Sequence, residues 1–303
     1  MAMTTDLRTS PKKARTPQRK TRELWDAIGL VANEYERLSV RQLYYQLVAR
    51  GVIEKTEATY KRVCDASAQM RLDGELPYRT FADGHRTRRG VFAHCGLNHA
   101  LESAHQLYRR NYWLDQPWYV EVWCEKDALT GVIQPVCEEY GVTYVATRGF
   151  PSITLRYESA HALIETGKPA IIFYFGDHDA SGRSISDNLE AELRHHGAEV
   201  TVARVALNPD QIDAWSLPTR PGKESDSRQA GFARRFGGAS VELDALPPDA
   251  LTDLVATAID ERIDEFSWMQ VEHIESLERE TLASLTEIAW QPGQSYRIEG
   301  AAS

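Results

Sequence analysis

The chain has 303 residues, a net charge of −9 at pH 7 and 42% hydrophobic residues. This size and composition predict a globular protein of about two domains with a sizeable core. Its longest apolar runs are strand-sized, far short of the ~20 residues of a membrane-spanning helix, and residues 1–22 lack the apolar core of a secretory signal. Four cysteines without paired spacing indicate reduced thiols. We therefore expect a cytoplasmic protein that has no contact with membranes.

The two parts of the chain carry opposite charge. Residues 1–110 contain 20 Lys or Arg and 12 Asp or Glu, whereas residues 111–303 contain 15 and 32. Such asymmetry is typical of proteins that contact nucleic acid through their basic part. The acidic part would repel phosphates unless a bound metal ion reversed the local field. A solvated charge imbalance without any partner is the alternative interpretation.

The N-terminal segment, residues 1–22, is basic and rich in Thr, Ser and Pro. This composition predicts a disordered basic arm. Such an arm can bind phosphates by releasing counterions, although an inert tail would have the same composition. Its basic residues are Arg8, Lys12, Lys13, Arg15, Arg19, Lys20 and Arg22.

The segment that follows has the periodicity of helices. Apolar side chains recur at helical spacing over 23–36. Ser39 begins a capping box with Gln42, which predicts a second helix that ends at Gly51. Thr56 can cap a third helix, which would extend to about residue 72.

The second and third helices, joined by a short turn, predict a helix-turn-helix, and residues 76–84 would form its wing. We therefore expect 23–112 to be a winged-helix DNA-binding domain; an ordinary helical bundle with solvated arginines is the alternative. The predicted contacts to double-stranded DNA are Lys61, Arg62, Gln69 and Arg71 on the recognition helix and Arg86, Arg88 and Arg89 in the following loop.

Beyond residues 115–117, strand and helix patterns alternate. This order predicts an α/β fold with a parallel sheet and right-handed crossovers. We expect 113–303 to form this second domain, with additional helices at its C-terminal end. The predicted strands are 118–124, 142–146, 170–176 and 199–205, and the predicted helices are about 127–140, 152–166, 182–196 and several from about 248 to 289.

Acidic residues follow two of these strands directly. Glu125 comes after the strand 118–124, and Asp177 and Asp179 come after the strand 170–176. In an open α/β sheet, ligands bind at the carboxyl ends of the strands. Because hard oxygen ligands suit Mg²⁺, the three carboxylates predict a Mg²⁺ site for phosphodiester chemistry on nucleic acid. A solvated acidic loop is the alternative.

Neighbouring residues add detail to this prediction. Gly182 permits a sharp entry into the next helix. Ser181 is expected to cap that helix, whose N-terminal dipole would face the same crevice. Lys126 would either contact phosphate beside Glu125 or be exposed in the first turn of a helix.

These motifs resemble a known family. A glutamate after the first strand and Asp-x-Asp after a later one are similar to the Toprim domain of topoisomerases, bacterial primases and nucleases of the overcoming-lysogenization-defect type. Upstream, Ser39–Tyr45 resembles the catalytic-tyrosine motif of the topoisomerase VI A subunit and of the related meiotic double-strand-break protein. The order of parts agrees over residues 38–205, and Val241–Leu246 resembles a later acidic segment. The chain departs from the pattern at Gln42, where the family usually carries an acidic residue.

The resemblance implies a DNA topoisomerase-like or endonuclease activity. Glu125, Asp177 and Asp179 would hold Mg²⁺, Tyr45 would be the nucleophile, and Arg41 would assist at the scissile phosphate. Family members act as homodimers in which the tyrosine of one subunit meets the metal site of the other. Because the chain has no ATPase motif, strand passage would need a separate ATPase subunit. Such a protein would be associated with the nucleoid.

The nucleophile stays open at this level. A tyrosine hydroxyl has a pKa of about 10 and needs a nearby cation or base to attack, and Arg41 lies one helical turn before Tyr45 on the same face. Tyr45 would then form a covalent tyrosyl–DNA intermediate. If Tyr45 is a packed aromatic side chain instead, water would be the nucleophile of a Toprim nuclease. A non-catalytic DNA-binding subunit of a larger complex is the third possibility.

Overall fold

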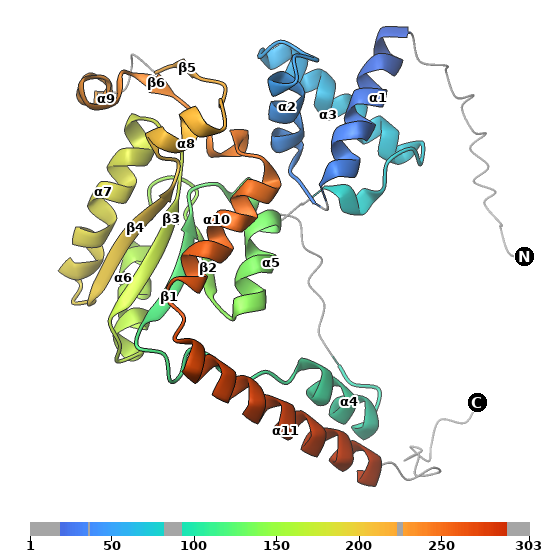
Figure 1. The fold of residues 1–303 in the computed structure, drawn as a ribbon, viewed down its shortest axis with the longest axis vertical. Helices are drawn as coiled ribbons and strands as arrows, with labels where there is room; N and C mark the ends of the chain where they lie inside the picture. The colour runs from blue at the N-terminus through green and yellow to red at the C-terminus, as the bar shows by residue number, and fades with distance from the viewer. Residues whose placement is uncertain (1–18, 36, 82–92, 223–226, 290–303) are drawn as a thin grey trace, which may run out of the picture. The chain divides into compact units, whose positions relative to one another are not determined.

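The computed structural model describes residues 19–35, 37–81, 93–222 and 227–289. The chain divides into two compact units, Met1–Phe81 and Ala82–Ser303, and each is described by itself (Figure 1). Residues 1–18 of the predicted basic arm lie outside the described residues. Its last four residues are helical, because the first helix begins at Arg19.

The first unit consists of three helices that pack against one another, α1 (Arg19–Glu34), α2 (Val40–Ala49) and α3 (Glu57–Leu72), followed by the short 3-10 turn η1 (Tyr78–Thr80). The predicted capping box is present: the Ser39 hydroxyl accepts from the Gln42 amide at 3.1 Å, and the Gln42 side chain accepts from the Ser39 amide at 2.8 Å. Thr56 caps α3 as expected. The three helices were therefore predictable from periodicity and capping.

The described part of this unit contains a single bridge of extended backbone, between Leu38 and Phe81. The last residues of the predicted wing, 82–84, lie outside the described residues. The helix-turn-helix order of α2 and α3 is present, and the winged-helix assignment stays a prediction.

The second unit contains a four-stranded parallel sheet in the order β2-β1-β3-β4. Its strands are β1 (Tyr119–Cys124), β2 (Thr143–Ala146), β3 (Ala170–Phe175) and β4 (Val200–Ala206). The connecting helices are α5 (Thr130–Tyr140), which follows the 3-10 turn η2 (Asp127–Leu129), α6 (Ile153–Glu165) and α7 (Ala180–His195). This confirms the expected α/β fold with a parallel sheet.

The core of this unit lies on both faces of the sheet. On one face, Trp123, Ile172 and Tyr174 pack with Leu163 of α6 and Leu189 of α7. On the other face, α5 packs with α10 (Pro248–Asp260) (Figure 1). Every side chain of β3 is buried, as expected for an inner strand of a parallel sheet covered on both sides.

The remaining elements are α8 (Pro209–Ala214), the two-stranded pair β5 (Arg220–Pro221) and β6 (Ala239–Ser240), α9 (Gln229–Phe236), the 3-10 turn η3 (Leu243–Ala245), α11 (Glu265–Ala289) and, before the sheet, α4 (Leu97–Leu107). Among the described helices, none combines the length and the apolar character needed to cross a membrane.

Helix α4 packs against α11. The link just after α4 is also attached there, because Arg110 forms an ion pair with Glu278 at 2.7 Å and its amide donates to Glu275 at 2.8 Å. These contacts place α4 in the second unit, so the units divide after Phe81 rather than near residue 112.

Candidate functional site

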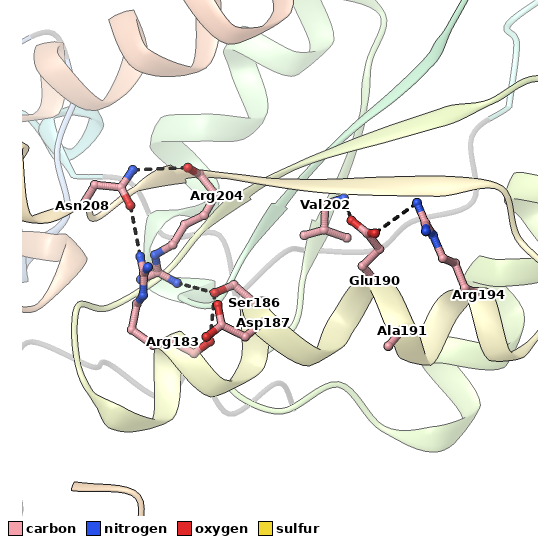
Figure 2. A pocket seen from close by; sticks show the side chains of 9 residues that line it. All are labelled: Arg183, Ser186, Asp187, Glu190, Ala191, Arg194, Val202, Arg204 and Asn208. Atoms are coloured by element: carbon pink, nitrogen blue, oxygen red, sulfur yellow. Dashed lines mark hydrogen bonds and ion pairs between the residues drawn. The ribbon is translucent and has the colours of Figure 1, made fainter. Parts of the chain in front are cut away.

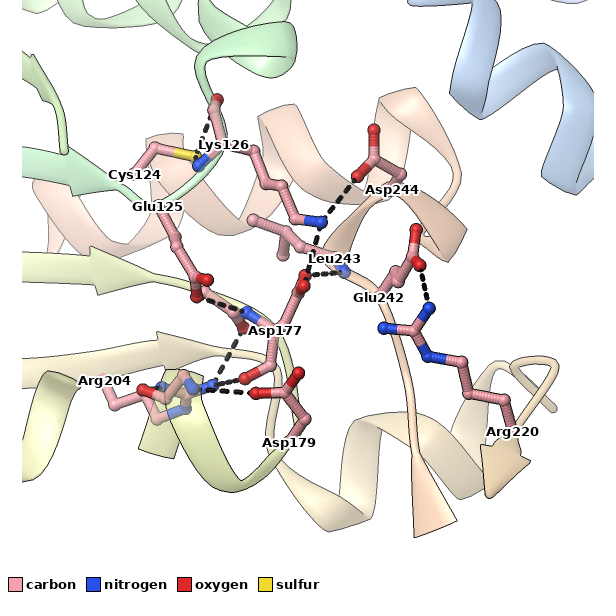
Figure 3. Close-up of polar contacts among 12 residues, drawn as sticks. Cys124, Glu125, Lys126, Asp177, Asp179, Arg204, Arg220, Glu242, Leu243 and Asp244 are labelled. Atoms are coloured by element: carbon pink, nitrogen blue, oxygen red, sulfur yellow. Dashed lines mark hydrogen bonds and ion pairs between the residues drawn. The ribbon is translucent and has the colours of Figure 1, made fainter. Parts of the chain in front are cut away.

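The sheet brings the predicted acidic strand ends together. Strands β1 and β3 are neighbours, with Cys124 opposite Phe175. The Glu125 amide donates to the Phe175 carbonyl at 2.8 Å, which continues the pairing by one residue. The Asp177 amide then donates to Oε2 of Glu125 at 3.1 Å (Figure 3). The two acidic motifs therefore meet at one edge of the sheet.

Two glycines make room for the Glu125 carboxylate. A Cβ atom on Gly176 would lie 2.6 Å from the Tyr174 ring and 2.9 Å from Oε2 of Glu125. A Cβ atom on Gly182 would lie 2.3 Å from the Asp177 carbonyl oxygen and 3.0 Å from the same Oε2. A side chain at Gly182 would collide with backbone, and one at Gly176 would require the Tyr174 ring and the Glu125 carboxylate to shift. The carboxylate therefore lies against bare backbone beneath the turn 176–182.

The Asp177 side chain is buried, with 5% of the residue exposed. Its Oδ1 accepts from the Leu243 amide at 2.8 Å, and its Oδ2 lies 2.8 Å from Nζ of Lys126 (Figure 3). Lys126 is thus half-buried and paired rather than an exposed lysine in the first turn of a helix, and its contact with phosphate stays a prediction. The lysine neutralises one of the predicted metal ligands.

Asp179 begins the helix after the motif. Its Oδ1 accepts from the Gly182 amide at 2.8 Å and caps α7. We expected Ser181 to provide this cap, but Ser181 lies within α7. The difference arises because the chain turns immediately after β3, so helix α7 starts at Ala180.

Burial and neighbouring negative charges raise the pKa values of Glu125 and Asp177. Burial, followed by the charge of Asp177, raises the pKa of Glu125 to about 7. Asp179 adds to this effect. Burial also raises the pKa of Asp177, although Lys126 opposes the shift. A divalent cation at this edge would relieve the repulsion.

The donor chemistry fits Mg²⁺, but the side chains do not form a ready-made cage. Among the described residues, no group of three His, Cys, Asp or Glu side chains could hold a metal ion. The Asp177 carboxylate faces Lys126, and the Asp179 carboxylate faces the N-terminus of α7. Mg²⁺ is usually bound by one or two carboxylates together with water and substrate phosphate, rather than by an all-protein cage. The site therefore fits Mg²⁺ as a partial set of ligands.

Arg204, on strand β4, holds the acidic turn in place. Its guanidinium donates to the carbonyl oxygens of Gly176, Asp177, Gly182 and Leu207 at 2.5–3.2 Å, and to the Ser186 hydroxyl at 3.0 Å. Burial lowers the pKa of Arg204 to about 10. The sequence did not predict this role, because nothing around an arginine in a strand indicates which backbone carbonyl groups it will contact.

The segment after β6 completes the site. His178 pairs with Val241 in an antiparallel bridge. This pairing places two further acids, Glu242 and Asp244, beside the acidic turn, and they are 5% and 0% exposed. Glu242 forms an ion pair with Arg220 (Figure 3). The resemblance of Val241–Leu246 to a family segment pointed to these residues, but no motif indicated their contacts.

Cations and an aromatic ring lie beside this edge. The Gly149 amide, in the loop after β2, donates to the Glu125 carbonyl at 3.3 Å. Next to it, Phe150 is 52% exposed, and the Arg228 guanidinium lies 5.0 Å from the centre of its ring. Arg228 also donates to the Ser181 hydroxyl at 3.3 Å. An exposed ring and a guanidinium are groups that stack on bases and bind phosphates.

The predicted nucleophile lies in the first unit. Tyr45 is 3% exposed, packs edge-on against Tyr44 with ring centres 5.4 Å apart, and has Nζ of Lys55 5.1 Å from its ring centre. Both Tyr44 and Tyr45 are buried, which fits the alternative of a packed aromatic side chain at Tyr45, because the turn that carries Lys55 covers this side of α2. The Arg41 guanidinium stacks on Tyr60 at 5.0 Å.

The predicted DNA contacts divide into three groups. Lys61, Arg62 and Gln69 are exposed on α3. Arg71 is half-buried, stacks on Phe81 at 4.8 Å and donates to the Ser67 carbonyl, so it also has a structural role. Arg86, Arg88 and Arg89 lie outside the described residues.

A cavity of about 410 Å³ lies between α7 and β4 (Figure 2). Its polar groups largely bind one another. Glu190 accepts from the Val202 amide at 2.9 Å, and Arg194 donates to the Val200 carbonyl at 2.8 Å. The Arg183 guanidinium donates to Asn208 at 3.1 Å. This cavity is therefore a weaker candidate for chemistry than the acidic edge.

Comparison with known proteins adds no relative to this description. No protein-family model matches the chain, and no curated protein matches it significantly. The resemblance to Toprim proteins therefore depends on the sequence motifs.

Proposed function

We propose that this chain cleaves DNA strands with the help of Mg²⁺ at the acidic edge of its sheet. The observation that carries the proposal is the hydrogen bond between the acidic ends of neighbouring strands, from the Asp177 amide to the Glu125 carboxylate. Glu125, Asp177 and Asp179 would form the acidic edge that holds the ion, with Asp177 paired to Lys126. When bound, Mg²⁺ orients the phosphate and stabilises the charge that develops on it.

The chain's own residues would position the substrate strand. Arg204 fixes the turn 176–182 through its carbonyl oxygens. Phe150 and Arg228 present a stacking surface and a positive charge beside the same edge. On the first unit, Lys61 and Arg62 are exposed and available to phosphates of double-stranded DNA.

For the nucleophile, we propose Tyr45 on the basis of the resemblance to the topoisomerase VI A subunit. Arg41 precedes it by one helical turn on α2 and would provide the nearby cation. The tyrosine and the carboxylates belong to different compact units. This separation is compatible with a homodimer in which one subunit supplies the tyrosine and the other the metal site. Strand passage would require a separate ATPase subunit, and the protein would act at the nucleoid.

One observation favours a second candidate, hydrolysis by water. Tyr45 is 3% exposed, and its ring is covered by Tyr44 and Lys55. Attack by Tyr45 therefore requires the side chain to become accessible. A Toprim nuclease with water as nucleophile needs no such change.

Cleavage of supercoiled DNA with Mg²⁺, followed by denaturation in detergent, tests both candidates. A covalent protein–DNA adduct that is lost in Tyr45→Phe but kept in the neighbouring Tyr44→Phe would establish the tyrosine. Cleavage that persists in Tyr45→Phe and is lost in Asp177→Asn would establish hydrolysis. DNA binding without Mg²⁺-dependent cleavage would contradict both and indicate a non-catalytic subunit.

A further inference from the structure

Lys126 lies between two buried carboxylates. Its Nζ is 2.8 Å from Oδ2 of Asp177 and 3.5 Å from Oδ2 of Asp244 (Figure 3). The Asp177 and Asp244 side chains are 7% and 1% exposed, and that of Lys126 is 23% exposed. The ammonium group is therefore held by two acids that come from distant parts of the sequence.

This arrangement is more than a surface ion pair. The Lys126 ammonium lies within ion-pair distance of two carboxylates whose side chains are almost fully buried, so it is the cation that faces both of them. A buried carboxylate without a cation would be strongly destabilising. The acidic edge thus requires a positive charge at this position.

The ammonium also divides the acidic edge into two parts. The Asp177 carboxylate accepts a hydrogen bond from the Leu243 amide and forms an ion pair with Lys126. The other two carboxylates approach a different residue: Oδ1 of Asp179 is 2.8 Å from the Gly182 amide, and Oε2 of Glu125 would lie 3.0 Å from a Cβ atom there. Glu125 and Asp179 therefore both lie beside Gly182.

We propose that Lys126 is a built-in cation that takes the place of a second divalent ion, so that the acidic edge binds a single divalent ion beside Glu125 and Asp179. The location of that ion depends on the proposed function. Nucleases and polymerases that use two ions hold them about 3.5–4 Å apart. In this chain the covalently attached Lys126 ammonium would supply the second positive charge. Lys126 acts as a positioning residue, because it acts through Asp177.

Counting bound Mn²⁺ tests this assignment, with Mn²⁺ used in place of Mg²⁺. The full chain is titrated by calorimetry, and the number of bound ions is checked by equilibrium dialysis. Wild type is expected to bind one Mn²⁺ per chain. Lys126→Met removes the ammonium, leaves Asp177 and Asp244 unneutralised, and is expected to bind two. Lys126→Arg keeps the charge and is expected to bind one.

The double variant Lys126→Met/Asp244→Asn is the matched control. It loses one cation and one carboxylate together, so it preserves the charge balance and is expected to bind one Mn²⁺. Two ions bound by wild type would overturn the proposal, and this result does not depend on whether Lys126→Met folds. An unchanged count in folded Lys126→Met would overturn it as well.

The same experiment separates this inference from the proposed function. If wild type binds one Mn²⁺ and Lys126→Met binds two, but wild type does not cleave DNA, the built-in cation is supported and the proposed function fails. If wild type binds two ions and cleaves DNA, the function stands and the built-in cation is wrong. If neither wild type nor folded Lys126→Met binds Mn²⁺, both proposals fail.

Discussion

The backbone amide of Asp177 donates to the carboxylate of Glu125 at 3.1 Å, so the ends of strands β1 and β3 are joined by a side chain as well as by the sheet. The same contact brings the carboxyl groups of Glu125 and Asp177 close together at a largely buried edge of the sheet. Burial and the Asp177 charge then raise the pKa of Glu125 to about 7. The stability of the second unit should therefore depend on pH near neutrality.

Replacing Glu125 by Gln should remove this dependence. The pKa of Glu125 is about 7 in the folded chain, compared with an ordinary value of 4.5. The folded state therefore binds more protons than the unfolded state between these pH values, and wild type loses stability as pH rises through them. At pH 8 we expect Glu125→Gln to have a free energy of unfolding roughly 2 kcal/mol higher than wild type.

Urea unfolding from pH 4 to pH 8 measures this difference. Near pH 4 the wild-type carboxyl is protonated, so the two proteins should differ little, which provides the internal control. Equal pH profiles for wild type and variant would show that Glu125 is not perturbed.

Adding a methyl group at Gly182 should disrupt the acidic turn. The new Cβ would lie 2.3 Å from the Asp177 carbonyl oxygen, which belongs to backbone and cannot easily move. We expect Gly182→Ala to lower the free energy of unfolding by roughly 1–3 kcal/mol. Gly231 lies within helix α9 with no atom within 4 Å of a new Cβ, so Gly231→Ala should be neutral or slightly stabilising. Chemical denaturation measures the free energy of unfolding of both variants. Equal values would contradict the predicted clash at Gly182.

Removing Arg204 should loosen the same turn from the other side. Arg204→Met leaves the carbonyl oxygens of Gly176, Asp177 and Gly182 without their donor. Unsatisfied buried acceptors of this kind lower the free energy of unfolding by roughly 3 kcal/mol. The exposed Arg148, whose side chain is 71% accessible and pairs with Asp127, provides the control. Arg148→Met should cost under about 1 kcal/mol, and a similar loss in both variants would refute the role of Arg204.

The exposed ring beside the acidic edge should contribute to DNA binding. If Phe150 stacks on a base, Phe150→Ala should weaken binding of an oligonucleotide roughly tenfold, within the range of one stacking contact. Fluorescence anisotropy with single-stranded and double-stranded probes measures the affinity. Phe266, on α11, is similarly exposed at 66% and serves as the control. Phe266→Ala should bind as wild type does, and unchanged binding by Phe150→Ala would exclude the stacking role.

The sequence predicted the parts of the site that depend on local pattern. The strand before Glu125 and the strand before Asp177 were recognisable from their apolar runs, and parallel pairing then placed their ends at one edge. The capping of α2 by Ser39 was equally local. These features depend on residues a few positions apart, which a sequence displays directly.

The partners of the acidic residues could not be predicted in this way. Lys126 meets Asp244, and Arg204 meets the turn at Gly182, because distant segments pack together. The packing of Tyr45 stayed open for a similar reason: helical periodicity indicates which residues share a face, but not that the turn carrying Lys55 covers that face.

The outer edge of β4 has one further consequence. Glu190 and Arg194 of α7 bind the amide of Val202 and the carbonyl of Val200, which a neighbouring strand would otherwise pair with. A strand from another molecule could add there only by displacing both side chains. Exposed strand edges are templates for aggregation, and these two side chains protect this edge. During synthesis, the sheet should therefore become resistant to edge-to-edge association at β4 once α7 has docked.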